Sequence, residues 1–378
     1  MERTDQRGFK MVLILLSLLL LWITHITYGR DVKILKNEGD YMSHAKVLSV
    51  SQIEESHVGE GGLTTAEVPF RALISSGPHK GKEVDGLQTL VYHGPVSRSV
   101  AVGDKILLYR VEFPNGETQY FFNSFYRLTP IFYLGAVFAL LVILLAHTKG
   151  LYTLIALILS ILAVFVVFVP YVLGGHNIYA GAVVVCIYSI LITIFLTNGL
   201  SKKSMVTIIG CTIGVIFAGL MSVYMDSVLE LTGVTGDTSV HLNLFNLEKP
   251  IDLRGIVFAS ILIGALGAVM DVAMDISSSL YEIKSHAPKI KFWELVGSGI
   301  NVGRDLMGTM SNTLILAYVG GGLSGILAMA LSSHNLSELL NREGIIVEML
   351  QALIGSMAIL LTIPITALTA GLFYIRKN

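Results

Sequence analysis

The sequence predicts an all-α polytopic membrane protein that carries a small all-β domain outside the membrane. Of the 378 residues, 53% are hydrophobic and only 14% are charged, whereas a soluble globular protein carries about 25% charge. The mean hydropathy is +0.70. The charge is also unevenly distributed, because residues 30–127 hold 23 of the 53 charged side chains. These observations indicate one aqueous domain followed by a membrane region.

Apolar segments of membrane-spanning length flank the charged block. A spanning helix needs about 20 mostly apolar residues, so the stretch 150–201 is long enough for two helices that turn at Gly174, Gly175, His176 and Asn177. With the apolar run 11–28, the sequence predicts eight hydrophobic segments. The charge-free stretches are residues 128–148, 150–201, 204–225, 255–270, 306–337 and 349–375.

We therefore expect three regions. Residues 1–29 have a short basic start and a Leu-rich run, which predict a signal anchor or a signal peptide. The residues from Trp22 to Tyr28 make a poor small-residue cleavage site, which favours the anchor. Residues 30–127 form the extracytoplasmic domain, and residues 128–378 form the multi-span helical domain.

The positions of lysine and arginine predict the orientation, since short cytoplasmic loops carry an excess of both. A cytoplasmic N-terminus, if the first segment is uncleaved, puts 12 basic residues inside and three in the opposite short loops. We therefore expect residues 30–127 outside and a cytoplasmic C-terminus. The 12 are Arg3, Arg7, Lys10, Lys149, Lys202, Lys203, Lys284, Lys289, Lys291, Arg304, Arg376 and Lys377, and the three are Lys249, Arg254 and Arg342.

Residues 30–127 contain short runs rich in β-branched and aromatic residues, which predict strands. These runs are residues 45–50, 67–74, 105–113 and 117–122. Between the last two runs, Asn115 and Gly116 predict a type I′ hairpin turn. We expect about five strands in an OB-like domain or another small barrel or sandwich, since a closed barrel removes exposed strand edges.

Several functional classes find no support. The net charge of −1 argues against nucleic-acid binding. The two cysteines, Cys186 and Cys211, lie in apolar runs and build neither a disulfide framework nor a CxxC site. The histidines of the N-terminal domain, His44, His57, His79 and His93, lack the regular spacing of metal ligands, so the metal content stays unknown.

The first polar stripe in the membrane region includes Asp271 and Asp275. With Gly264, Gly267, Ser278 and Ser279 they recur every three or four residues, so they share one helix face. Two carboxylates one turn apart can share a proton or a cation. Alternatively, Asp271 and Asp275 can both sit at the wet cytoplasmic boundary. Asp271 lies about 28 Å along the helix from Asp252, which is nearly the whole thickness of the hydrocarbon core.

A second stripe consists of Asn301, Asp305, Gly308 and Asn312, and Arg304 next to it offers a positive charge. It leads to Gly320, Gly321 and Gly322. Three glycines cost about 1 kcal/mol each in a helix interior, which predicts a backbone break of the kind that lines substrate sites. A close-packing glycine patch is the alternative.

A third stripe on the last segment includes Gln351. Its other members are Gly355, Ala358, Thr362, Thr366 and Thr369, again three or four residues apart. The three stripes can meet around a polar path, or they can pack helix against helix without a ligand.

Two long motifs, MDVAMDISSSLYE and GSGINVGRDLMGTMSNTLILAYVGGG, carry a resemblance to the YibE/F-like family of bacterial membrane proteins. The resemblance covers roughly residues 125–375. It implies a multi-pass fold in a bacterial plasma membrane. The extra N-terminal domain resembles the YibE type, which implies a shorter YibF-like partner protein. The resemblance implies no reaction.

We expect a membrane transporter or permease component that moves a small solute or cation and has no catalytic residue. In this hypothesis Asp271, Asp275 and Asp305 carry the cation or proton, and Asn301, Asn312 and Gln351 line the path. We expect no cofactor, and coupling to a divalent cation or a proton stays open. Besides the lipid bilayer, we expect a YibF-like partner or a homo-oligomer.

Two alternatives stay open. The protein can be a non-catalytic subunit or sensor that works with a YibF-like partner. It can also be a metal-dependent intramembrane enzyme in which Asp271 and Asp275 hold Mg²⁺, although the sequence lacks a cluster of basic residues to bind a phosphate.

Overall fold

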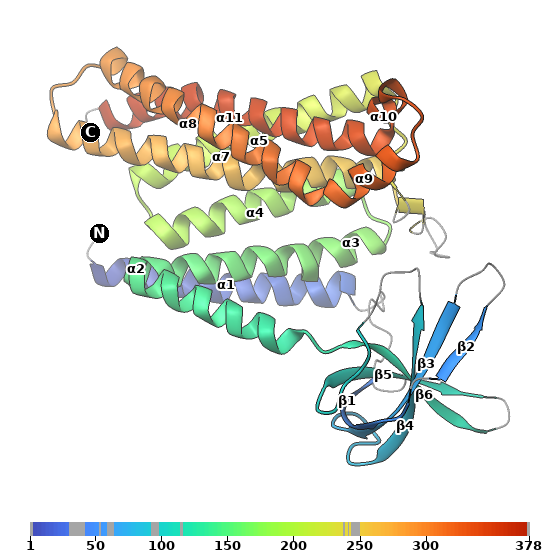
Figure 1. The fold of residues 1–378 in the computed structure, drawn as a ribbon. Helices are drawn as coiled ribbons and strands as arrows, with labels where there is room; N and C mark the ends of the chain where they lie inside the picture. Colours follow the sequence, from blue (N-terminus) through green and yellow to red (C-terminus); the bar gives the residue numbers. More distant parts are fainter. Residues whose placement is uncertain are drawn as a thin grey trace. The chain divides into compact units, whose positions relative to one another are not determined.

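The computed structural model describes residues 3–29, 42–52, 54–58, 64–91, 98–113, 116–236, 239–240, 242 and 250–375. The chain divides into two compact units (Figure 1). One is Lys33–Leu141, and the other combines Met1–Val32 with Val142–Asn378.

The smaller unit contains a closed β-barrel. Its sheet has the order β1-β5-β6-β4-β3-β2, and an additional β1–β3 pairing closes five of the strands into a ring. The β4–β6 pair is parallel, and the other pairs are antiparallel. Without β2, this is the connectivity of an OB fold. The strands are β1 (Met42–Val50), β2 (Glu54–Val58), β3 (Thr64–Ile74), β4 (Glu83–Val91), β5 (Lys105–Glu112) and β6 (Thr118–Phe125).

The four predicted strand runs correspond to β1, β3, β5 and β6. The run that became β4 was not predicted, because it begins with acidic residues and contains Gly86. The structure explains this glycine: a β-carbon at Gly86 would lie 2.6 Å from the ring of Phe70, which belongs to the barrel core. Of the predicted hairpin turn, Asn115 lies outside the described residues, and Gly116 has a positive φ of 82°.

The larger unit is a helical bundle. Within the described residues, six helices are long and apolar enough to cross a membrane, and a seventh span results if the bent pair α8 and α9 counts as one. This confirms the predicted polytopic fold class. The helices are α1 (Arg3–Gly29), α2 (Leu128–Leu162), α3 (Val169–Leu173), α4 (Ile178–Asn198), α5 (Lys202–Leu229), α7 (Leu253–His286), α8 (Phe292–Gly321), α9 (Leu323–Leu331), α10 (Leu336–Asn341) and α11 (Glu343–Ile375), with a π-helical turn, Ala163–Phe168, between α2 and α3.

The difference between seven spans and the eight expected segments lies in the helical run Leu128–Leu173. His147, with φ 50° and ψ −128°, interrupts the helical geometry of this run. A β-carbon at Gly150 would collide with the carbonyl oxygen of Val142, which is eight residues earlier. In a straight helix these residues are about 12 Å apart, so the chain folds back at His147 and the run holds two of the expected segments.

Helix α11 packs against α5, α7 and α8. Its contact with α5 depends on two glycines, because β-carbons at Gly210 and Gly214 would collide with the hydroxyl oxygens of Thr366 and Thr362. Lipid tails are as apolar as the helices, so no hydrophobic force drives membrane helices together. Close packing at small residues, which let two backbones approach, is therefore a main contribution to helix association. The residues Thr362 and Thr366 are fully buried, as the packing alternative for the third stripe requires.

We predict that Gly214→Val destabilises the bundle, because the added side chain must separate α5 from α11. Overpacking of a close contact costs about 1–3 kcal/mol, which should lower the midpoint of thermal unfolding in detergent. Gly267→Val is the matched control, since a β-carbon at Gly267 meets nothing within 4 Å. Equal midpoints for the two variants would contradict the close approach.

Candidate functional site

The two acids of the first stripe lie on an uncovered face of α7, whereas Gly264 of the same stripe packs against Tyr318 of α8. Asp271 and Asp275 are exposed, whereas Ala273 and Ile276 on the other side of the helix are fully buried. Lys203, in the first turn of α5, is close enough to attract the Asp275 carboxylate. The described residues contain no group of three His, Cys, Asp or Glu side chains that could hold a metal ion.

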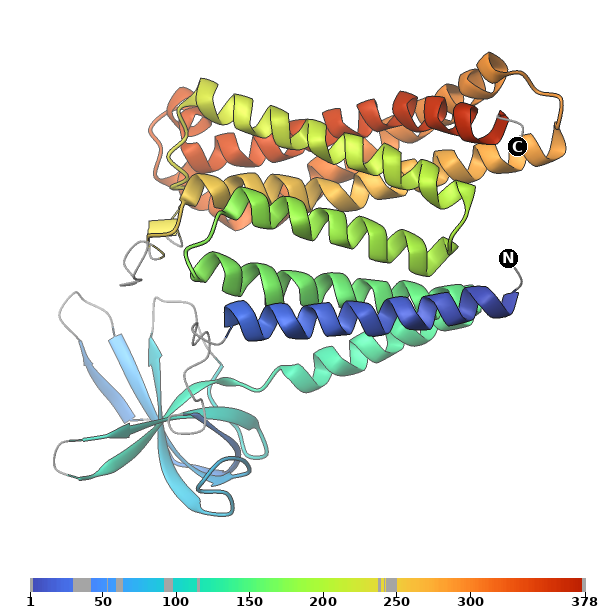
Figure 2. The same cartoon turned by 180° about the vertical axis from the view of Figure 1, so that it is seen from behind.

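The same end of this unit collects basic residues. Lys10 donates to the carbonyl oxygen of Thr197 at 3.4 Å, and its ammonium lies 4.2 Å from the centre of the Tyr152 ring. The hydroxyl of Ser277 donates to the carbonyl oxygen of Lys203 at 3.1 Å. The α4–α5 and α7–α8 connections lie at this end as well (Figures 1 and 2). Asp275 is therefore close to the basic end, which supports the boundary alternative for this residue.

The second stripe lies on the outer face of α8. Asn301, Asp305, Gly308 and Asn312 are all exposed, and the buried residues of this helix are Leu295, Val296, Gly299 and Gly303. The Arg304 guanidinium donates to the side-chain oxygen of Asn301 at 3.3 Å. It forms no ion pair with Asp305, because consecutive residues on a helix do not face each other.

The third stripe divides between two environments. Thr362 and Thr366 are buried against α5, whereas Gln351 donates from its amide nitrogen to the Ser260 hydroxyl of α7 at 2.8 Å. Within the described chain, no hydrogen bond or ion pair joins a stripe residue of one helix to a stripe residue of another. Helical periodicity groups the residues of each stripe along one side of a helix, and the three stripes have different neighbours in the bundle.

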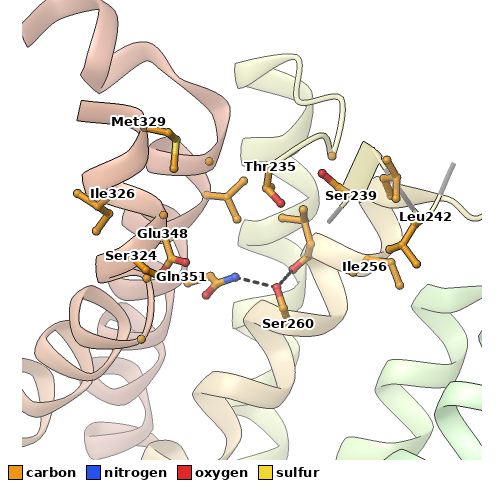
Figure 3. A pocket seen from close by; sticks show the side chains of 18 residues that line it. Thr235, Ser239, Leu242, Ile256, Ser260, Ser324, Ile326, Met329, Glu348 and Gln351 are labelled. Carbon is orange, nitrogen blue, oxygen red and sulfur yellow. Dashed lines mark hydrogen bonds between the residues drawn. The ribbon is translucent and has the colours of Figure 1, made fainter. Parts of the chain in front are cut away.

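A pocket of about 470 Å³ lies next to Gln351 (Figure 3). Four parts of the chain surround it: the α5–α7 connection, the first turns of α7, the α8–α9 break and the start of α11. It is lined by Gly233, Thr235, Ser239, Leu242, Leu253, Ile256, Val257, Ser260, Gly321, Gly322, Ser324, Gly325, Ile326, Met329, Gly344, Val347, Glu348 and Gln351.

The predicted backbone break forms one wall of this pocket. Helix α8 ends at Gly321, and α9 continues after Gly322 at an angle of 57°. A β-carbon at Gly322 would lie 2.9 Å from a carboxylate oxygen of Glu348, whereas one at Gly320 or Gly321 would meet nothing within 4 Å. Gly322 is therefore the position where the broken backbone and an acidic side chain approach each other.

The polar groups of the pocket are one carboxylate, one amide and several hydroxyls. Figure 3 shows Glu348, Gln351 and Ser324 gathered on one side, with Ser260 between Gln351 and the backbone of α7. The Ser260 hydroxyl donates to the carbonyl oxygen of Val257 at 2.8 Å, which orients it to accept from Gln351. None of the lining residues is a lysine or arginine, so the half-buried Glu348 gives the pocket a negative character.

Sequence reasoning missed Glu348, although a signal was present. Glu348 lies three residues before Gln351 and so extends the third stripe by one turn. Glu348 itself falls outside the charge-free stretches, because the stretch 349–375 begins directly after it. The structure shows that a boundary acid can still point into a pocket between helices.

The α5–α7 connection is fixed beside the pocket by Glu343. Its carboxylate accepts from the backbone nitrogens of Thr232 and Gly233 at 2.8 and 2.5 Å and from the Thr232 hydroxyl at 2.7 Å. Gly344 permits this contact, because a β-carbon there would lie 2.5 Å from the carbonyl oxygen of Thr235. The first turn of α11 thus holds one side of the pocket in place.

A family model described as YibE/F-like protein matches residues 134–376. The match begins within α2 and includes the pocket, both motifs and Lys149, Lys202 and Lys203 of the basic end, whereas Lys10 and the β-barrel lie outside it. Comparisons with curated proteins and with solved structures found no significant match.

We predict that Glu343→Gln loosens the α5–α7 connection, because a neutral amide replaces a carboxylate that accepts three hydrogen bonds. Hydrogen bonds to a charged group contribute about 1.5–3 kcal/mol each, and part of this should be lost. A cysteine at Thr235 should then react faster with a maleimide than in the parent chain. Glu294→Gln, at the far end of α8, is the control, and an unchanged reaction rate at position 235 would show that Glu343 does not fix the connection.

Proposed function

The chain belongs to the YibE/F-like family, and we propose that it is the solute-binding component of a membrane transporter. The observation that carries the proposal is the pocket at the α8–α9 break. Irregular backbone at membrane depth is tolerated only where protein buries it or where it lines a cavity. Interrupted helices of this kind supply the substrate sites of transporters.

The size and charge of the pocket favour a small solute with a positive group. A volume of about 470 Å³ is within the range of small-molecule sites. Glu348 provides a carboxylate without a basic neighbour among the lining residues, while Gln351 and Ser324 provide neutral polar groups. The apolar side chains of Val257, Ile326 and Met329 would cover the remaining surface of the solute.

The acids of the α7 and α8 stripes have a second role in this proposal. Asp271, Asp275 and Asp305 would exchange a cation or proton with the solvent at the basic end, away from the pocket. Ser260 and Asp271 are 11 residues apart on α7, which corresponds to about 16 Å along the helix. Solute binding and ion exchange would therefore occur at separate places on the same helix.

The orientation of the transporter follows from the basic end. We propose that Lys10, Lys149, Lys202 and Lys203 face the cytoplasm, as the excess of basic residues in cytoplasmic loops favours. The pocket lies at the opposite end of α7, so it would receive its solute from the extracytoplasmic side. Residues 30–127 would be on that side too, because α1 leads to them from the basic end.

We predict that Glu348→Gln abolishes solute binding, because the pocket then loses its negative charge. A panel of small amines and inorganic cations should raise the thermal unfolding midpoint of the purified parent chain, and a ligand at 100 times its Kd stabilises by about 2.7 kcal/mol. The ligand found should then accumulate in proteoliposomes. Glu282→Gln, an exposed acid near the end of α7, is the control. A ligand that stabilises Glu348→Gln as well as the parent would contradict the proposed site.

The three consecutive glycines at the end of α8 allow a test of the close approach between Glu348 and Gly322. We predict that Gly322→Ala weakens ligand binding, because the new methyl group displaces the Glu348 carboxylate. Gly320→Ala should leave binding unchanged, since its methyl group meets no atom within 4 Å. Titrations of both variants with the ligand identified above would measure this, and equal affinities would show that the approach of Glu348 to Gly322 is unimportant.

A further inference from the structure

The outer face of α8 carries polar and charged side chains that no other helix of this unit covers. Asn301, Arg304, Asp305 and Asn312 are exposed, as is Gly308 between them. Within the described chain, Arg304 bonds only to Asn301, and Asp305 forms neither a hydrogen bond nor an ion pair. Charged and amide side chains are costly when they face lipid and usually face a protein interior.

Contacts with α7 place this face relative to the bundle. Gly264 packs against Tyr318, and Leu280 packs against Gly299, so α7 and α8 are antiparallel neighbours. By this register Asp305 lies at about the level of Asp275, near the basic end. Asn312 lies about 10 Å further along the helix from Asp305, and its amide forms no hydrogen bond within the described chain.

The exposed residues follow a heptad pattern. The positions 301, 305, 308, 312, 315 and 319 are separated alternately by four and three residues, and all six are exposed. This 3.5-residue repeat is the pattern with which two helices pack along a left-handed seam. Membrane helices commonly pack this way, with small residues for close approach and amides for hydrogen bonds. Gly308 and the two asparagines supply these features.

We propose that this face of α8 binds the same face of a second copy of the chain. Two copies inserted with one orientation have parallel α8 helices, so identical residues meet at the same height. Asn301 then meets Asn301 of the second copy, and Asn312 meets Asn312. An amide both donates and accepts, so it is complementary to itself.

The charges fit the same arrangement. In the heptad, Asp305 occupies a seam position and Arg304 the flanking position before it. Across a twofold axis between parallel helices, Arg304 of each copy lies beside Asp305 of the other. By the same register the two Asp305 carboxylates face each other across the axis, and the Arg304 guanidinium of each copy neutralises Asp305 of the other. Two ion pairs therefore form at residues that have no ion pair within the described part of the single chain. This complementarity favours a second copy over an unrelated partner.

Disulfide formation in native membranes tests the seam. The native cysteines, Cys186 and Cys211, are fully buried, so the full chain serves as its own background. Asn312→Cys and Gly308→Cys place thiols on the seam, and the latter meets no atom within 4 Å. Thr313→Cys is the matched control, since it is exposed and points about 100° away from Asn312. After mild oxidation, we expect at least about fivefold more dimer of twice the chain mass at both seam positions than at the control.

Charge exchange tests the pairing of Arg304 with Asp305. Energy transfer between labelled copies in liposomes gives the association constant. We expect Arg304→Asp to weaken association about tenfold, because it removes both cations and leaves four acids together at this level of the seam. Adding Asp305→Arg to this variant restores the opposite charges and should return association to within about threefold of the parent.

Several results would overturn the proposal. These are equal disulfide yields at positions 312 and 313, no dimer at any position, or a disulfide product of another mass, which would identify a different protein as the occupant. Failure of the double variant to recover would do the same, provided that its unfolding midpoint matches the parent. The cysteine series stands even if the charge variants do not fold.

Discussion

The break between α8 and α9 is constrained by the need of every backbone group in hydrocarbon for a hydrogen-bond partner. A straight helix meets this need internally, and Gly322 keeps helical partners on both sides of the bend. Its backbone nitrogen donates to the carbonyl oxygen of Tyr318, and its carbonyl oxygen accepts from the backbone nitrogen of Ile326, each at 2.9 Å. The carboxylate of Glu343 accepts hydrogen bonds from the backbone of Thr232 and Gly233 in the α5–α7 connection. The first turns of α11 thus hold this connection and place Glu348 and Gln351 in the pocket beside the bend.

The sequence was sufficient to predict the classes of structure. Absence of charge over 20 residues is a direct consequence of the cost of charge in lipid, so the spanning segments could be read from it. The fold-back at His147 lies close to Lys149, the charged residue that separates the charge-free stretches 128–148 and 150–201. Strand β4 was harder to predict, because Gly86 has no side chain and so interrupts the alternation of apolar and polar residues that marks a strand. The reason for a glycine here is the Phe70 ring, which leaves no room for a β-carbon.

The arrangement of the stripes could not be predicted in the same way. A period of 3.6 residues determines which side chains share a face, but not which neighbour that face meets. Thr362 and Thr366 proved to fit the glycines of α5, whereas Asn301 and Asp305 point away from the bundle. Glu348 was missed because the sequence specifies the position of a charged residue along its helix but not the neighbour that its side chain faces. Only the surrounding helices show that this carboxylate points into a pocket.

Helix α8 connects the features of this unit that have functional potential. Its buried face packs on α7 and α11, its outer face carries the heptad positions up to Val319, and its end at Gly321 opens the pocket. The last heptad position is three residues before Gly322. A second copy that covers the outer face would therefore restrain α8 almost to the break, while α9 beyond the 57° bend would stay outside the seam. A movement that opens or closes the pocket would then fall at Gly321 and Gly322, where the absence of side chains permits a change of backbone angle. In this arrangement dimerisation would not compete with solute binding, since each uses a different face of the same helix.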